Sequence, residues 1–161
     1  MTQKLLIPYL DISSPILSSE VRDKYNANIV SFSLSDYEDR DKLKRFAASI
    51  QAYDISVGVY VNLEDAKSTK EIKNQTDSLS LLFSLSLDFD HVMGIIPEDF
   101  NSYKNARRWL QQVRSVLPDN TKLLVLYETE AEVLKAFTED SEDIKAVDNI
   151  YHVSEWINYD A

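Results

Sequence analysis

The feature that most constrains the fold is the alternation of strand-like apolar runs with amphipathic helical patterns along the chain. Runs rich in β-branched and aromatic residues predict strands over residues 5–12, 28–34, 55–61, 81–89, 123–127 and 150–153. Helical patterns fill several of the intervals between these strands. Strands that alternate with helices form right-handed βαβ units, which assemble into a largely parallel sheet. The sequence therefore predicts the α/β class, with a sheet that is either doubly wound or closed into a barrel.

Helices are predicted over residues 38–53, 66–79, 97–117 and 129–137. The first is the clearest, because its apolar residues recur every three or four positions and so share one helix face. The third is opened by Pro97 and stopped by Pro118. The fourth is predicted from a capping box that starts at Thr129.

Composition limits the kind of protein and its partners. The 161 residues contain no Pro/Gly-rich linker and predict a single α/β domain over residues 1–161. A net charge of −10 argues against nucleic acid and anionic membranes as partners, because binding to phosphates relies on clustered Lys and Arg. No run approaches the ~20 apolar residues of a membrane span, and no signal peptide is recognisable. We expect a soluble protein, whose compartment the sequence leaves undetermined.

Several kinds of chemistry are excluded by residue type. The chain has no cysteine, so disulfides, thiolate nucleophiles and cysteine-ligated metals are ruled out. Gly58 and Gly94 are the two glycines, and neither belongs to a Gly-rich phosphate loop. His91 is a lone histidine next to acids, which is as often a surface residue as a ligand, and His152 has no evident partner in the sequence, so a metal site is only a minor alternative. No cofactor is predicted.

Acidic residues follow or end several predicted strands. They are Asp11, Asp36, Asp88, Asp90 and Glu128. In a parallel α/β fold the strand ends meet at one edge, where functional residues gather. Asp88 and Asp90 would share one strand face about 6.6 Å apart along the backbone, a separation that suits the paired carboxylates of glycoside hydrolysis. The alternative is that these acids form turns or the solvated end of a strand.

Aromatic residues accompany these acids. Tyr9, Tyr60, Tyr127 and Trp156 lie in or near predicted strand ends, where their rings could stack on a sugar. Packing within the core or at its rim is the alternative for each ring.

The order of these motifs resembles the family 25 glycoside hydrolases, the phage-type lysozymes that cut peptidoglycan. Asp11-Ile12-Ser13 resembles the D-x-S motif that ends the first strand of that family. Val57-Gly58-Val59-Tyr60 resembles its V-G-x-Y strand, and Asp88-Phe89-Asp90 occupies the place of its D-x-E motif. Tyr127 and the pair Trp156 and Tyr159 match later aromatic positions. The resemblance spans most of the chain.

The resemblance implies a shortened, TIM-like (β/α) barrel with a glycan-binding cleft. It implies that Asp90 is the general acid, with Asp88 and Asp11 as partners. The strand-end aromatic residues Tyr9, Tyr60, Tyr127 and Trp156 are the candidates for contact with the sugar. Asp90 is one methylene shorter than the glutamate of the family, and an error of ~1 Å in reach can cost about 100-fold in rate. We therefore expect a phage- or prophage-associated domain that binds cell-wall glycan or has a structural role, with hydrolysis lost or weakened.

Two further hypotheses remain open. The chain could be an active muramidase that cleaves peptidoglycan through its strand-end carboxylates, or an acidic module that binds a basic protein through its helix faces. A barrel without its last two strands would also expose sheet edges, which pair readily with other chains. Homo-oligomerisation, or a place in a larger assembly, is therefore expected.

Overall fold

The computed structural model describes residues 6–10, 18–24, 26–33, 40–84 and 88–155. Its strands are β1 (Leu6–Leu10), β2 (Ile29–Ser33), β3 (Ser56–Asn62), β4 (His91–Ile96), β5 (Lys122–Tyr127) and β6 (Asn149–His152). The helices are α1 (Ser18–Asp23), α2 (Arg40–Gln51), α3 (Thr69–Ser84), α4 (Tyr103–Val116) and α5 (Lys135–Thr138). Short 3₁₀ turns follow three strands: η2 (Leu63–Asp65), η3 (Glu132–Leu134) and η4 (Val153–Glu155). None of the helices in these ranges is long and apolar enough to cross a membrane.

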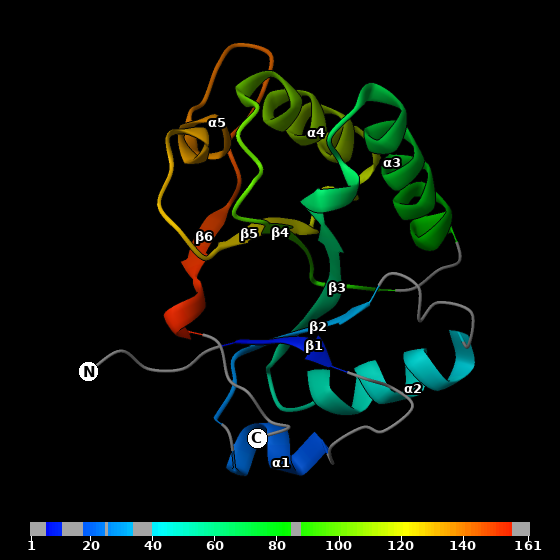
Figure 1. The fold of residues 1–161 in the computed structure, drawn as a ribbon. Coiled ribbons are helices and arrows are strands. Elements are labelled where there is room, and N and C mark those ends of the chain that lie inside the picture. Colours follow the sequence, from blue (N-terminus) through cyan, green and yellow to red (C-terminus); the bar gives the residue numbers. More distant parts are fainter. Residues whose placement is uncertain (1–5, 11–17, 25, 34–39, 85–87, 156–161) are drawn as a thin grey trace.

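The strands form one sheet in sequence order, and every neighbouring pair is parallel. Figure 1 shows that the sheet is curved and that the helices lie on its outer side, with α1 and α2 in one group and α3, α4 and α5 in another. Within the described residues β1 and β6 form the two ends of the sheet and do not pair with each other. The predicted α/β class is confirmed, with the architecture of an incomplete (β/α) barrel.

The outer face of the sheet carries the main core. Parallel strands in register present alternate residues to the same side, so the valines of β3 and β4 meet the buried faces of the helices. Trp109 of α4 lies in this core with its ring centroid 6.0 Å from that of Phe137. A Cβ atom on Gly94 would lie 2.7 Å from the Trp109 ring, so the absence of a side chain there gives the indole its space.

The inner, concave face has its own apolar cluster. Met93 and Ile95 of β4 and Leu124 and Leu126 of β5 are buried there. Ile29 of β2 packs against this cluster although β3 separates its strand from β4. Contact between strands that are not neighbours requires the sheet to curl over itself, as in the layered interior of a barrel.

The predicted strand over residues 81–89 is wrong. Helix α3 extends to Ser84, and the strand begins only at His91. The segment Leu79-Ser-Leu-Leu-Phe-Ser fits both periods, because its apolar residues alternate locally and also continue the helical spacing that starts at Ile72. The helix prevails because Ile72, Leu79 and Leu82 then share one fully buried face.

Other predicted elements are confirmed with shifted bounds. Helix α4 begins at Tyr103, where the Ser102 hydroxyl accepts a hydrogen bond from Asn105 N–H, and not at Pro97. The capping box at Thr129 does not form a helix there; the chain makes η3 and the short α5 instead. Strand β4 went unrecognised because His91 and Gly94 interrupt its pattern of β-branched residues.

Candidate functional site

The predicted acids do not gather at one edge of the sheet. Glu128 follows β5 and lies at the carboxyl edge, where parallel strands end. Asp88 and Asp90 precede β4 and lie at the opposite, amino edge. Asp11 and Asp36 fall outside the described residues. Asp88 and Asp90 therefore lead into a strand instead of ending one, and the predicted position of this pair at the carboxyl edge is wrong.

Asp90 has a structural position at the amino edge. Its Oδ2 atom accepts hydrogen bonds from Val57 N–H at 2.9 Å and from Gln51 Nε2 at 3.1 Å. Its own N–H donates to the Val57 carbonyl oxygen at 2.7 Å. Asp90 thus supplies an acceptor for the N–H at the start of β3, which the sheet itself leaves without one.

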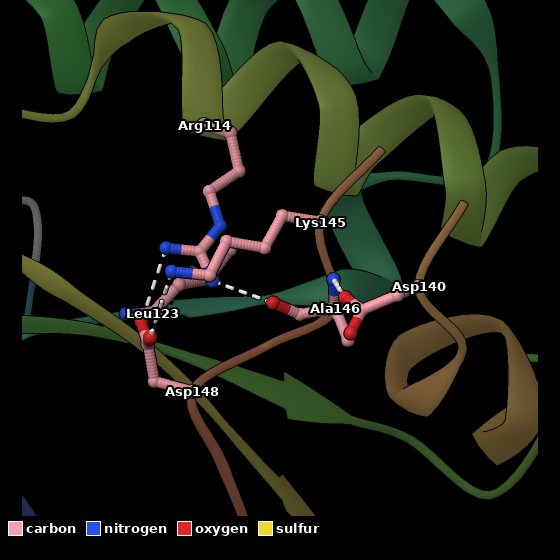
Figure 2. Close-up of polar contacts among 6 residues, drawn as sticks. All are labelled: Arg114, Leu123, Asp140, Lys145, Ala146 and Asp148. Atoms are coloured by element: carbon pink, nitrogen blue, oxygen red, sulfur yellow. Dashed lines mark hydrogen bonds and ion pairs between the residues drawn. The ribbon is translucent and has the colours of Figure 1, made fainter. Parts of the chain in front are cut away.

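Asp148 repeats the arrangement two strands further along the sheet (Figure 2). Its N–H donates to the Leu123 carbonyl oxygen at 2.8 Å, and its Oδ2 atom accepts from Leu123 N–H at 2.7 Å. Arg114 of α4 donates to the same oxygen at 3.0 Å and to the Ala146 carbonyl oxygen at 2.6 Å. Burial opposes ionisation of Asp148, but the Leu123 hydrogen bond and the Arg114 guanidinium together hold its pKa below the usual value.

Asp90 with Val57, and Asp148 with Leu123, thus make the same kind of contact, which we call the aspartate clip. In each case an aspartate just before a strand exchanges two hydrogen bonds with the second residue of the preceding strand, which is also its neighbour in the sheet. Because the same contact occurs twice, a structural role in the sheet accounts for both aspartates. It leaves the catalytic role predicted for Asp90 without support from its position.

Two shallow hollows border Asp90 at the amino edge. One, of about 310 Å³, is lined by Gln51, Asp54, Ile55, Ser56 and Asp90. The other, of about 210 Å³, is bordered by Asp88, Phe89, Pro118 and Thr121, among other residues. The described residues contain no group of three or more acids and histidines arranged to hold a metal ion.

The carboxyl half of the concave face is a better candidate for a binding site than the amino edge. Tyr60 of β3 and Tyr151 of β6 are half-buried and pack against the apolar cluster of β4 and β5. Asn62 ends β3 on the same face as Tyr60 and pairs in register with Ile95 of this cluster. An apolar floor with aromatic rings and a few polar groups is typical of small-molecule sites.

Asn62 is held in place from two sides. Its side-chain oxygen accepts a hydrogen bond from Glu64 N–H at 2.9 Å and thereby caps η2. Its carbonyl oxygen accepts from Gln75 Nε2 at 3.1 Å, while Trp109 Nε1 donates to Gln75 Oε1 at 2.7 Å. This buried chain fixes the carboxyl end of β3 to helices α3 and α4.

The predicted aromatic residues do not form one cluster. Tyr60 lies on the inner face, whereas Tyr127 pairs with Ile96 and lies on the outer face. There the Tyr127 ring packs edge-on against His152, with the centroids 5.1 Å apart. Tyr9 belongs to β1, but its side chain is not described, and Trp156 falls outside the described residues.

Tyr151 and Asn62 were missed as candidates. Tyr151 follows Ile150 in the short predicted strand, so alternation puts these two residues on opposite faces. Which face is concave could not be read from the pattern. Burial of Tyr151, reinforced by the nearby Glu155 carboxylate, raises the pKa of its hydroxyl, so it stays protonated as a hydrogen-bond donor.

Comparison with known proteins supports the fold. No protein-family model and no curated protein matches the chain. A mutant O-GlcNAc hydrolase from Thermobaculum terrenum is similar in structure, with a TM-score of 0.56 and 12% identity over 89% of this chain and 40% of that one. The N-acetylneuraminate lyase from Mycoplasma synoviae is also similar, with a TM-score of 0.52 and 13% identity over 93% of this chain and 55% of that one.

The chain has the fold of part of an α/β barrel. It spans about half or less of each of these two structures. At such low identity the likeness concerns the fold alone, since one fold serves many functions. Membership of glycoside hydrolase family 25 and a phage origin stay predictions.

Proposed function

We propose that this chain is a carbohydrate-binding domain with a barrel fold of the glycoside hydrolase kind, which binds cell-wall glycan without hydrolysing it. The observation that carries the proposal is the composition of the concave face. Its carboxyl half offers Tyr60, Tyr151 and Asn62 above an apolar floor. None of the described strand residues that point to this face is acidic.

The aromatic residues support sugar binding. A pyranose ring presents a face of C–H groups that packs on an aromatic ring, while its hydroxyls take hydrogen bonds from polar neighbours. Tyr60 and Tyr151 come from strands on either side of β4 and β5, whose side chains form the floor between them. One of the similar structures is, by its name, an O-GlcNAc hydrolase, which fits a sugar ligand.

Among the described residues, no inward-facing strand position carries a carboxylate and the predicted pair Asp88 and Asp90 precedes β4, which argues against hydrolysis through that pair. Glycoside hydrolases use two carboxyl groups about 5–9 Å apart on either side of the scissile bond. Asp90, the predicted acid, lies at the amino edge and is engaged by Val57 and Gln51. Binding without turnover is therefore the function best supported by the described residues.

The test is co-sedimentation of the full chain with purified peptidoglycan across about pH 4 to 7, with reducing ends assayed in the same tubes. Tyr60→Leu and Tyr151→Leu keep apolar bulk but remove the flat ring. Each is expected to weaken binding about 3- to 10-fold. Tyr103→Leu is the matched control, because Tyr103 is exposed on α4, away from the concave face.

The possible outcomes separate the hypotheses. Binding that falls in both concave-face variants and persists in the control, with no sugar release, supports the proposal. Release of reducing ends would establish a muramidase instead. An absence of glycan binding, combined with salt-dependent capture of a basic protein, would favour the acidic interaction module.

A further inference from the structure

His91 joins three strands at the base of the concave face. Its ring is fully buried at the start of β4. Nε2 lies 2.7 Å from the Ser31 hydroxyl of β2, and Nδ1 lies 2.7 Å from the Ser56 hydroxyl at the start of β3. Both ring nitrogens are therefore hydrogen-bonded, each to a different neighbouring element.

Gly58 allows the ring to span β3. Gly58 pairs with His91 across the β3–β4 ladder and with Ser31 across the β2–β3 ladder. A Cβ atom on residue 58 would lie 2.5 Å from Cδ2 of the His91 ring and would also collide with the His91 carbonyl oxygen. The glycine thus leaves the space through which the imidazole reaches from β4 to β2.

The surroundings tolerate a neutral ring but offer little to a charged one. A serine hydroxyl can rotate to donate or to accept, so both tautomers of neutral imidazole are satisfied. In the described part of the chain, two charged residues are neighbours of His91, one in the sequence and one across the β4–β5 ladder. Asp90 is adjacent in the chain, but its carboxylate is taken by Val57 and Gln51, and Lys122 of β5, which pairs with His91, is itself a cation.

We propose that His91 makes the sheet sensitive to acid. While its ring is neutral it holds β2, β3 and β4 together, and protonation of the ring weakens this junction. The geometry carries the proposal, since a cation at this position would sit fully buried between two neutral hydroxyls. This inference does not depend on the proposed sugar site.

The sign and size of the effect follow from linkage. Burial lowers the pKa of His91 from 6.5 to about 4, and the Asp90 carboxylate offsets this only in part. The unfolded chain then binds the proton more readily than the folded one. Stability is fully present above pH 6.5 and falls as the pH drops from 6.5 towards 4. The unfolding constant is expected to rise up to tenfold per pH unit, or about 300-fold in total.

The test is urea unfolding of wild type, His91→Gln and His152→Gln between about pH 7 and 4, the interval set by the two pKa values. Gln keeps a donor and an acceptor but cannot take up the proton. Between pH 7 and 4 the rise in unfolding constant relative to His91→Gln should reach about 100-fold for the wild type, because at pH 4 about half of the folded His91 rings are already protonated. The control His152→Gln keeps His91 and should retain that rise.

A spectroscopic measurement on the wild type tests the proposal even if His91→Gln does not fold. Long-range ¹H–¹⁵N spectra of wild type should show the His91 ring neutral to about pH 5, as expected for a folded-state pKa near 4. A folded-state titration near the ordinary value of 6.5 would overturn the proposal. So would a His91→Gln variant whose stability changes with pH as steeply as that of the wild type.

Discussion

Replacing Asp148 tests whether the aspartate clip stabilises the sheet. The carboxylate is 24% exposed and Arg114 is 20% exposed, so solvent screens their contact only partly. Asp148→Ala removes the acceptor of Leu123 N–H and one of the two described acceptors of the Arg114 guanidinium. Losing a charge-assisted hydrogen bond and leaving a partly buried cation underpaired should cost about 2–3 kcal/mol. For a chain of this size that lowers Tm by about 4–12 °C.

Thermal and urea unfolding measure this loss. Asp148→Asn keeps one acceptor for Leu123 N–H and should lose less than Asp148→Ala. Asp143→Ala is the matched control, because Asp143 is exposed on the same connection and should change little. The double variant Arg114→Met/Asp148→Ala should cost less than the sum of its single changes.

The effect of Asp148 also depends on pH. Its pKa is lowered on folding, so its contribution is present above the ordinary value of 3.8 and is lost as the pH falls through the lower folded-state pKa. A stability difference between wild type and Asp148→Ala below about 0.5 kcal/mol at neutral pH, the size of an ordinary surface change, would refute the reasoning.

Three further predictions concern other parts of the fold. Gly58→Ala should cost about 2 kcal/mol or more, because the new Cβ meets a backbone oxygen that cannot move freely; an unchanged urea midpoint would show that the strands adjust. Asp90→Asn should lower the urea midpoint while leaving glycan binding intact, since the clip lies at the amino edge; loss of binding without loss of stability would restore Asp90 to the site. The end strands β1 and β6 should mediate self-association, visible in light scattering, and a strictly monomeric species would contradict this.

The class of fold follows from the local pattern of the sequence. Strand-like runs separated by amphipathic helices leave few topologies other than a parallel α/β sheet, because crossover connections are right-handed and place helices over the sheet. The apolar spacing of residues 38–53 and the glycine of Val57-Gly58-Val59-Tyr60 could both be recognised locally. These features depend on neighbours within one turn or one strand.

Long-range packing, in contrast, determines at which edge of the sheet the candidate residues lie and what they can do there. Residues 79–84 fit a helix and a strand almost equally well, and burial of Leu79 and Leu82 against the core settled the helix. That choice moved Asp88 and Asp90 from the end of a strand to the beginning of the next. An acid before a strand and an acid after one look alike in sequence, yet they lie at opposite edges of the sheet.

The buried junction at His91 shows the same limit. Ser31, Ser56 and His91 are far apart in the chain, and only the parallel register of β2, β3 and β4 brings them together. Likewise, Tyr60 and Tyr127 both lie near strand ends. Tyr60 pairs with Met93 and Tyr127 with Ile96, and these two residues of β4 lie on opposite faces of the sheet. Local pattern fixes which elements form, whereas long-range pairing and curvature fix which side chains meet, because those contacts join segments that no sequence window contains.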